Sequence, residues 1–101
     1  NMILSANGQN IYPEEIEAVV NNQDFVIESV VVDRGASLVA LVYVNKDKLS
    51  AAGLELDAQM NILKNEVNKS MPSYSKIAKV EVMDQPFEKT PKMSIKRFMY
   101  K

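Results

Sequence analysis

Cysteine and histidine are both absent from the 101-residue sequence. Without cysteine, the chain can form no disulfide and offers no thiolate nucleophile. Without histidine, it lacks the commonest metal ligand and the side chain most often used as a general base near neutral pH. Any chemistry of this chain therefore depends on lysine, arginine, carboxylate or backbone groups, and no metal site is expected. The absence of cysteine fits a cytoplasmic protein.

A charge excess of either sign is also missing. Lys and Arg number 12 and Asp and Glu number 13, which leaves a net charge of −1. This balance gives no electrostatic footprint for nucleic acid or for an anionic membrane surface. The longest strongly apolar run, Leu38–Val44, is far shorter than the roughly 20 residues of a membrane-spanning helix. No signal peptide is visible, so we expect neither a nucleic-acid partner nor a transmembrane segment.

The length and the hydrophobic content of 47% fit one small domain with a modest core. The chain begins at Asn1 rather than at methionine, and its first residues already resemble a strand. We therefore expect a piece of a longer protein, cut at a domain boundary.

Hydrophobic spacing predicts an α+β domain in which two helices pack on a three-stranded sheet, preceded by a short β-ribbon. A turn is expected at residues 33–36, and a loose connection with at most one helical turn at residues 46–56. Asp57 is expected to cap the second helix and Pro72 to stop it. The last strand should be half-buried, with Ala78, Val80 and Val82 on one side. The expected elements are a ribbon of Met2–Leu4 with Asn10–Tyr12, a helix at Pro13–Asn21, strands at Val26–Asp33 and Leu38–Asn45, a helix at Asp57–Ser70 and a strand at Ile77–Met83.

A first motif runs from residue 8 to residue 17, with the sequence Gly-Gln-Asn-Ile-Tyr-Pro-Glu-Glu-Ile-Glu. Pro13 suits the first position of a helix because its missing N–H would have no partner there. Glu14 and Glu15 then lie in the first turn, where the helix dipole favours negative charge. Taken alone, the motif describes an ordinary junction between a strand and a helix.

A second motif runs from residue 88 to residue 98, with the sequence Glu-Lys-Thr-Pro-Lys-Met-Ser-Ile-Lys-Arg-Phe. Taken alone, it is a basic, proline-interrupted tail beside an apolar pair, Phe87 and Phe98. The simplest interpretation of such a tail is a solvated charged segment.

Together, the two motifs resemble the small C-terminal domain of adenylate-forming enzymes. This superfamily contains acyl-CoA synthetases, firefly-type luciferases and the adenylation domains of peptide synthetases. A Gly-x-x-Ile-x-Pro-x-Glu-Ile-Glu run opens that domain after a hinge, and a Pro-x-Thr-Pro-x-Gly-Lys-Ile-x-Arg loop closes it. The matching residues are Gly8, Ile11, Pro13, Glu15, Ile16 and Glu17 at the first motif, and Thr90, Pro91, Ile95 and Arg97 at the second.

The sequence departs from this pattern at Met93, where the family usually has glycine, and at Ser94, where it has its catalytic lysine. The resemblance implies that this lysine bridges the substrate carboxylate and the α-phosphate of ATP. A serine hydroxyl has no charge to offer the developing negative charge there. Three interpretations stay open: an engineered replacement, a natural loss of activity, or substitution by a neighbouring lysine.

Lys92 and Lys96 are the candidates for such a substitution. In an extended loop, residues two apart project to the same side. Both lysines flank Ser94 at that spacing, and we expect either to reach the same pocket if the loop shifts.

The resemblance gives Gly8 a role in the second half-reaction, beside the pantetheine arm of coenzyme A. Close backbone approach is the physical reason for a glycine there. A turn glycine needed only for its dihedral angles is an equally good interpretation. Glu15 and Glu17 lie two apart on a helix and do not face each other. We expect them to be dipole partners and surface charges, with one of them bridging to a basic residue.

The resemblance as a whole implies that residues 1–101 are the C-terminal lid domain of an AMP-forming acyl-CoA synthetase. The wording of the motifs is most similar to bacterial long-chain fatty acid–CoA ligases. ATP, coenzyme A and magnesium would be the cofactors, a carboxylic acid the substrate and the chain's own large N-terminal domain the partner. The isolated domain is expected to be inactive. Another adenylate former, or a free-standing α+β regulatory module that binds a small molecule, remains an alternative.

Overall fold

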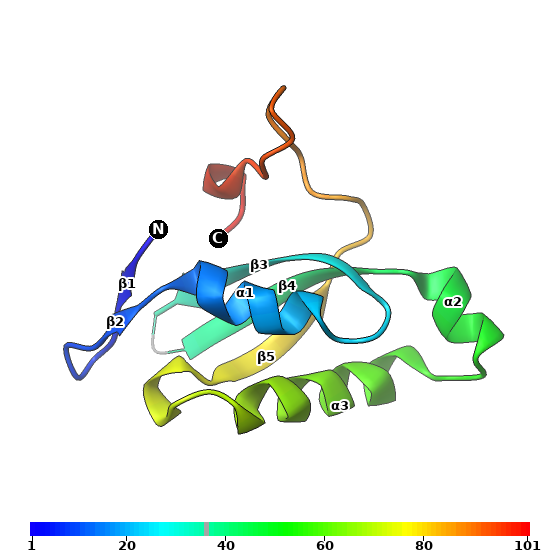
Figure 1. Cartoon of the computed structure of the whole chain (residues 1–101), viewed down its shortest axis with the longest axis horizontal. Helices are drawn as coiled ribbons and strands as arrows, with labels where there is room; N and C mark the ends of the chain where they lie inside the picture. The colour runs from blue at the N-terminus through cyan, green and yellow to red at the C-terminus, as the bar shows by residue number, and fades with distance from the viewer. Residues whose placement is uncertain (36) are drawn as a thin grey trace.

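The computed structural model describes residues 1–35 and 37–101. Figure 1 shows a three-stranded sheet with helices α1 and α3 on one side and the C-terminal segment on the other. This arrangement confirms the predicted α+β domain with its N-terminal ribbon. The elements are β1 (Ile3–Leu4), β2 (Asn10–Ile11), α1 (Pro13–Asn21), β3 (Val26–Arg34), β4 (Ser37–Val44), α2 (Lys46–Ala51), α3 (Leu56–Lys69), η1 (Ser73–Ser75), β5 (Ile77–Val82) and η2 (Arg97–Met99).

Strand β4 lies at the centre of the sheet, between β3 and β5. It runs antiparallel to β3 and parallel to β5, so the chain crosses over through α2 and α3 before β5. Residues Leu38–Val42 are all buried. This confirms the expectation from the near-continuous apolar run of β4, because a central strand that is covered on both faces buries all of its side chains.

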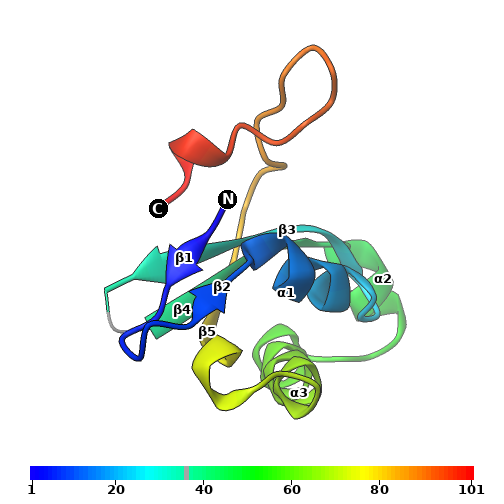
Figure 2. The same cartoon turned by 60° about the vertical axis from the view of Figure 1, so that its left-hand side comes forward.

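The larger core lies between the sheet and the helices. Alternate residues of β4 point to it, because successive side chains of a strand face opposite sides. Ile16 and Val20 of α1 and Leu63 and Val67 of α3 complete it at helical spacing. The figures show α3 along the underside of the sheet and α1 beside β3 (Figures 1 and 2).

A smaller core lies on the opposite face of the sheet. Val30 and Val32 of β3, with Val39 and Leu41 of β4, form its floor, and Phe87 covers them. Ile95 and Tyr100 pack against the same cluster. The C-terminal segment is therefore the second layer over this face, and the interpretation of a solvated tail holds only for part of it, since residues 91–94 and Phe98 are exposed.

The connection between β4 and α3 is more ordered than expected. Residues Lys46–Ala51 form helix α2, and Asn45 caps its first turn. The side-chain oxygen of Asn45 accepts a hydrogen bond of 2.9 Å from the backbone N–H of Lys48. Helix α3 begins at Leu56 and its cap is Glu55, not Asp57. The longer Glu55 side chain reaches the N–H groups of residues 57 and 58, at 2.6 and 3.3 Å.

Ala78 is exposed rather than directed at the core, although Val80 and Val82 do pack there. In the turn expected at residues 33–36, Gly35 has a φ of +74°, which a glycine adopts without strain. Ala36, the last residue of that turn, lies outside the described residues.

Candidate functional site

The second motif folds back on itself as a small hairpin rather than an extended loop. Lys89 and Ile95 form an isolated antiparallel bridge. At its closed end, the N–H of Thr90 donates to the carbonyl of Ser94 and the N–H of Met93 donates to the carbonyl of Thr90, both at 2.8 Å. We call residues 90–94 the Ser94 turn. Figures 1 and 2 show this segment extending away from the sheet.

Met93 occupies the left-handed region of backbone conformation, with a φ of +67°. An L-residue pays roughly 1–2 kcal/mol for this conformation, whereas glycine adopts it freely. The turn therefore suits the glycine that the related motif has at this position. The Met93 side chain is 73% exposed, so methionine meets no steric obstacle beyond its own backbone.

Ser94 and Lys92 are both exposed on this turn. Lys96 follows the bridge, and its backbone N–H donates to the carbonyl of Glu88 at 2.8 Å. Lys92 lies in the turn, whereas Ser94 and Lys96 lie on either side of Ile95 on the return leg. The roles of Ser94, Lys92 and Lys96 stay predictions.

The return leg of the hairpin is fixed by an ion pair between Arg97 and Glu17 of α1. The two guanidinium nitrogens of Arg97 donate to the two carboxylate oxygens of Glu17 at 2.8 and 2.5 Å. The Glu17 side chain is only 9% exposed and the Arg97 side chain 24%. Hydrogen bonding from Glu17 raises the pKa of Arg97 above its ordinary value. Such a two-point contact fixes orientation as well as distance.

Glu17 also binds a third element. Its Oε2 atom accepts a hydrogen bond of 2.7 Å from the backbone N–H of Val31 in β3. Within the described residues, β3 is an edge strand of its sheet, with β4 on one side only, and Glu17 supplies the acceptor for this N–H. The expectation of a surface charge at Glu17 is wrong, because Glu17 lies on the helix face of the buried Pro13 and Val20. As expected, one of the two glutamates, Glu17, forms an ion pair with a basic residue, Arg97.

The outgoing leg is fixed by a second ion pair, between Lys89 and Glu28 of β3. The Lys89 ammonium lies 2.7 Å from the Glu28 carboxylate, whose side chain is 17% exposed. Neither Glu28 nor Lys89 was singled out from the sequence. The partners lie 61 residues apart, and no local pattern signals such a pair.

An open groove of about 440 Å³ lies between α1, β3 and the hairpin. Both ion pairs line it, as do Ser94 and Ile95. The groove thus brings the two motifs of the sequence into contact, through Glu17 of the first and Arg97 of the second.

Gly8 lies elsewhere, at the turn between β1 and β2, and the structure does not bring it to the Ser94 turn (Figure 1). Its φ is +80°, and its N–H donates to the carbonyl of Ser5 at 3.0 Å. A Cβ atom added to Gly8 would meet nothing within 4 Å. The turn therefore requires a positive φ at Gly8, while none of the described residues lies close to the position that a Cβ atom would take there.

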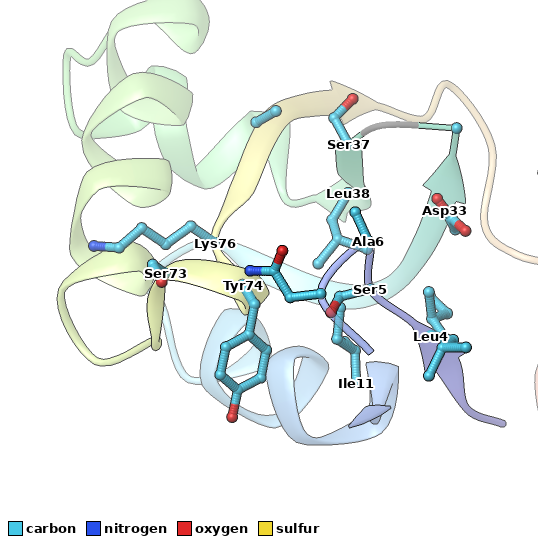
Figure 3. Close-up of a pocket in the computed structure, with 14 residues that line it drawn as sticks. Leu4, Ser5, Ala6, Ile11, Asp33, Ser37, Leu38, Ser73, Tyr74 and Lys76 are labelled. Atoms are coloured by element: carbon cyan, nitrogen blue, oxygen red, sulfur yellow. The ribbon is translucent and has the colours of Figure 1, made fainter. Parts of the chain in front are cut away.

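A second hollow, of about 310 Å³, lies beside the ribbon and is shown in Figure 3. Its walls come from the β1–β2 turn, the ends of β3 and β4, and the residues around Tyr74 and Lys76. Across the described residues, no group of three acidic, cysteine or histidine side chains is placed to hold a metal ion. No helix among them has both the length and the apolar character needed to cross a bilayer.

Comparison with solved structures finds the same fold as a part of several larger enzymes. The adenylation domain of a carboxylate reductase from Mycobacterium chelonae matches with a TM-score of 0.80 and 19% identity, over 98% of this chain and 17% of that chain. An anthranilate CoA ligase in complex with anthranoyl-AMP matches with a TM-score of 0.81 and 18% identity. The match covers 97% of this chain and 18% of that chain. A Mycobacterium tuberculosis fatty acyl CoA synthetase matches with a TM-score of 0.70 and 22% identity, again over 97% of this chain and 18% of that chain.

These identities establish a shared fold, and this chain spans about a fifth of the length of those structures. No match is found among curated protein sequences. The sequence itself matches the AMP-binding enzyme C-terminal domain over residues 1–100. The hairpin with its Ser94 turn, the ribbon with Gly8 and the α+β body thus form one unit, and the chain belongs to the family of AMP-binding enzyme C-terminal domains.

Proposed function

We propose that this chain is the C-terminal domain of an AMP-forming fatty acid–CoA ligase. The observation that supports this most is the exposed Ser94 turn, which extends from a domain of this family at the point where the related motif has its lysine. A large N-terminal domain would hold ATP, magnesium and the carboxylic acid. Residues 1–101 would close over it, and the enzyme would work in the cytoplasm.

The proposed reaction has two steps. In the first, a carboxylate oxygen attacks the α-phosphorus of ATP, which gives an acyl adenylate and releases pyrophosphate. In the second, the thiol of coenzyme A attacks the acyl carbon and AMP leaves. One small domain would serve both steps by presenting different faces, which is a hinge motion.

The side chain at position 94 decides the first step in this proposal. Negative charge accumulates on the oxygens around the phosphorus, and a compact positive charge stabilises it. Ser94 has a hydroxyl only. We expect the enzyme with Ser94 to form acyl adenylate poorly and the Ser94→Lys enzyme to form it well.

Fatty acids are the proposed substrate class because the motifs resemble those of long-chain ligases and a fatty acyl CoA synthetase shares the fold. A second candidate is the adenylation domain of another enzyme class, which the match to a carboxylate reductase favours. The acyl product distinguishes the two, because a CoA ligase transfers the acyl group to free coenzyme A.

The first experiment is ATP–pyrophosphate exchange by the full-length enzyme, with Ser94 and with Ser94→Lys. Exchange by the lysine enzyme alone would identify this position as the adenylation site. Equal exchange by both would show that another residue supplies the charge, and Lys92→Ala and Lys96→Ala would then identify it.

The role of Gly8 is tested by Gly8→Asn, because asparagine tolerates a positive φ while it fills space. We expect adenylate formation to persist and thioester formation to fall sharply, if coenzyme A approaches this turn closely. Gly53→Asn is the matched control, since Gly53 also has a positive φ and open surroundings. Normal thioester formation by Gly8→Asn would leave Gly8 with a purely conformational role.

A further inference from the structure

The Ser94 turn has two legs, and each leg is tied to a different element of the domain body. The outgoing leg is tied to β3 through Lys89 and Glu28, and the return leg to α1 through Arg97 and Glu17. The first and last residues of the turn, Thr90 and Ser94, donate hydrogen bonds to each other. The orientation of the turn is therefore set at its base.

Glu17 is the stiffer of the two anchors. Its carboxylate is held by Val31 at one oxygen and by the Arg97 fork at both. A buried carboxylate with three hydrogen bonds has little freedom to rotate. Since Val31 belongs to β3, Glu17 fixes the return leg to the helix and to the sheet at once.

Glu28 supplies the second point of attachment. It follows an irregularity in the β3–β4 pairing, between Val26 and Glu28. A single anchor would let the hairpin pivot, whereas anchors on two elements oppose rotation. Beneath them, Phe87 and Tyr100 meet edge to face, with ring centres 4.9 Å apart, and support the base from below.

From this geometry, we infer that Glu17 and Glu28 are positioning residues that hold the Ser94 turn in the orientation needed for adenylate formation. The inference rests on the proposed function, because it assigns the turn a target in the large domain. Both residues act through Arg97 and Lys89 and touch no reacting atom. Their contribution is the alignment of position 94, where a misplacement of about 1 Å lowers a rate by up to roughly a hundredfold.

A distance measurement tests the positioning directly. The chain has no cysteine, so Lys92→Cys on the turn and Asn65→Cys on α3 provide two labelling sites in the full-length enzyme, with cysteines of the large domain replaced. Double electron–electron resonance between nitroxides at these sites should give a narrow distance distribution. We expect Glu17→Gln and Glu28→Gln to broaden it and Glu15→Gln, an exposed residue of the same helix, to leave it unchanged.

Charge reversal gives a sharper test of the Glu28 pair. Glu28→Lys alone should broaden the distribution, and Glu28→Lys combined with Lys89→Glu should narrow it again. Distributions that coincide in all variants would overturn the inference, because the turn would then be held by other contacts.

The kinetic test uses the Ser94→Lys enzyme. We expect Glu17→Gln and Glu28→Gln to lower kcat for ATP–pyrophosphate exchange by roughly ten- to a hundredfold, with little change in KM for ATP. Thioester formation from preformed acyl adenylate should be spared, since that step uses another face of the domain. Equal loss in both half-reactions would overturn the inference in favour of general destabilisation. An inactive Ser94→Lys parent with a broadened distance distribution in the variants would contradict the proposed function and leave the anchoring supported.

Discussion

The two faces of the sheet are covered in different ways. On one face, α1 and α3 bury a continuous apolar core that includes Leu63, Val67 and Val42. On the other face, the C-terminal segment buries one phenylalanine and relies on two ion pairs and an aromatic contact. The first face is built to hold the fold together. The second is built to hold one short turn in place, with contacts that are few and specific.

The largest loss of stability is expected when the apolar core under α3 is disturbed. Leu63→Ala on α3 should lower the free energy of unfolding by about 2–5 kcal/mol, because it removes buried methyl groups and leaves a cavity. Urea denaturation of the 101-residue chain measures it. Ile62→Ala, at an exposed position of the same helix, is the matched control. A loss below about 1 kcal/mol for Leu63→Ala would show that the helical face is loosely packed.

The next largest loss of stability is expected when the C-terminal segment loses its ion pair with α1. Arg97→Met should lower the free energy of unfolding by about 1.5–3 kcal/mol, because it removes hydrogen bonds to a buried carboxylate. Lys69→Met is the control, since its pair with Glu66 is exposed and should contribute less than about 1 kcal/mol. If both variants behave alike in the same urea titration, the Glu17–Arg97 pair is no stronger than a surface pair.

Much of the helical face could be predicted from the sequence, because its signals are local. Proline followed by two glutamates marks the start of α1, and the apolar run of β4 marks a strand covered on both sides. The sequence predicts the cap of α3 two residues late, at Asp57, since aspartate is a preferred cap and only the backbone path selects Glu55.

The tail was harder to predict, because its contacts join residues far apart in the chain. Glu17 and Arg97 each appeared in a motif, yet nothing in the spacing of either motif pairs them. The turn needs a positive φ at Met93, and a methionine in the sequence gives no signal for such a conformation. The motif consequently predicts an extended loop where the structure has a closed hairpin.

A smaller effect tests the aromatic support of the tail. The Tyr100 hydroxyl accepts a hydrogen bond of 2.7 Å from the N–H of Glu88. Tyr100→Phe keeps the ring contact with Phe87 and removes this bond, which should lower stability by about 0.5–1.5 kcal/mol. Hydrogen exchange should rise at the Glu88 amide and stay constant in α3. Faster exchange throughout α3 would mean that the two faces unfold as one unit.

The smallest effect is a pH dependence at the rim of the sheet. Hydrogen bonding from Arg34 lowers the pKa of Glu81 below its ordinary value of 4.5. A lowered pKa in the folded state adds stability above the ordinary value, and this contribution is lost as the pH falls through the folded pKa. Glu81→Gln should therefore flatten the loss of stability with acid below about pH 4.5. Thermal unfolding from pH 6 to pH 3 measures this, and parallel curves for both proteins would contradict it.

The contact between Glu17 and Arg97 also sets an order of assembly. The two residues lie 80 positions apart, so their meeting closes nearly the whole chain into a loop, which is entropically unfavourable until most of that chain is already structured. We therefore expect docking of the C-terminal segment to be a late event in folding and its release an early event in unfolding. A chain emerging from the ribosome would complete its sheet and helices while residues 88–101 were still unattached, and the nascent domain would acquire its Ser94 turn only after these residues had emerged.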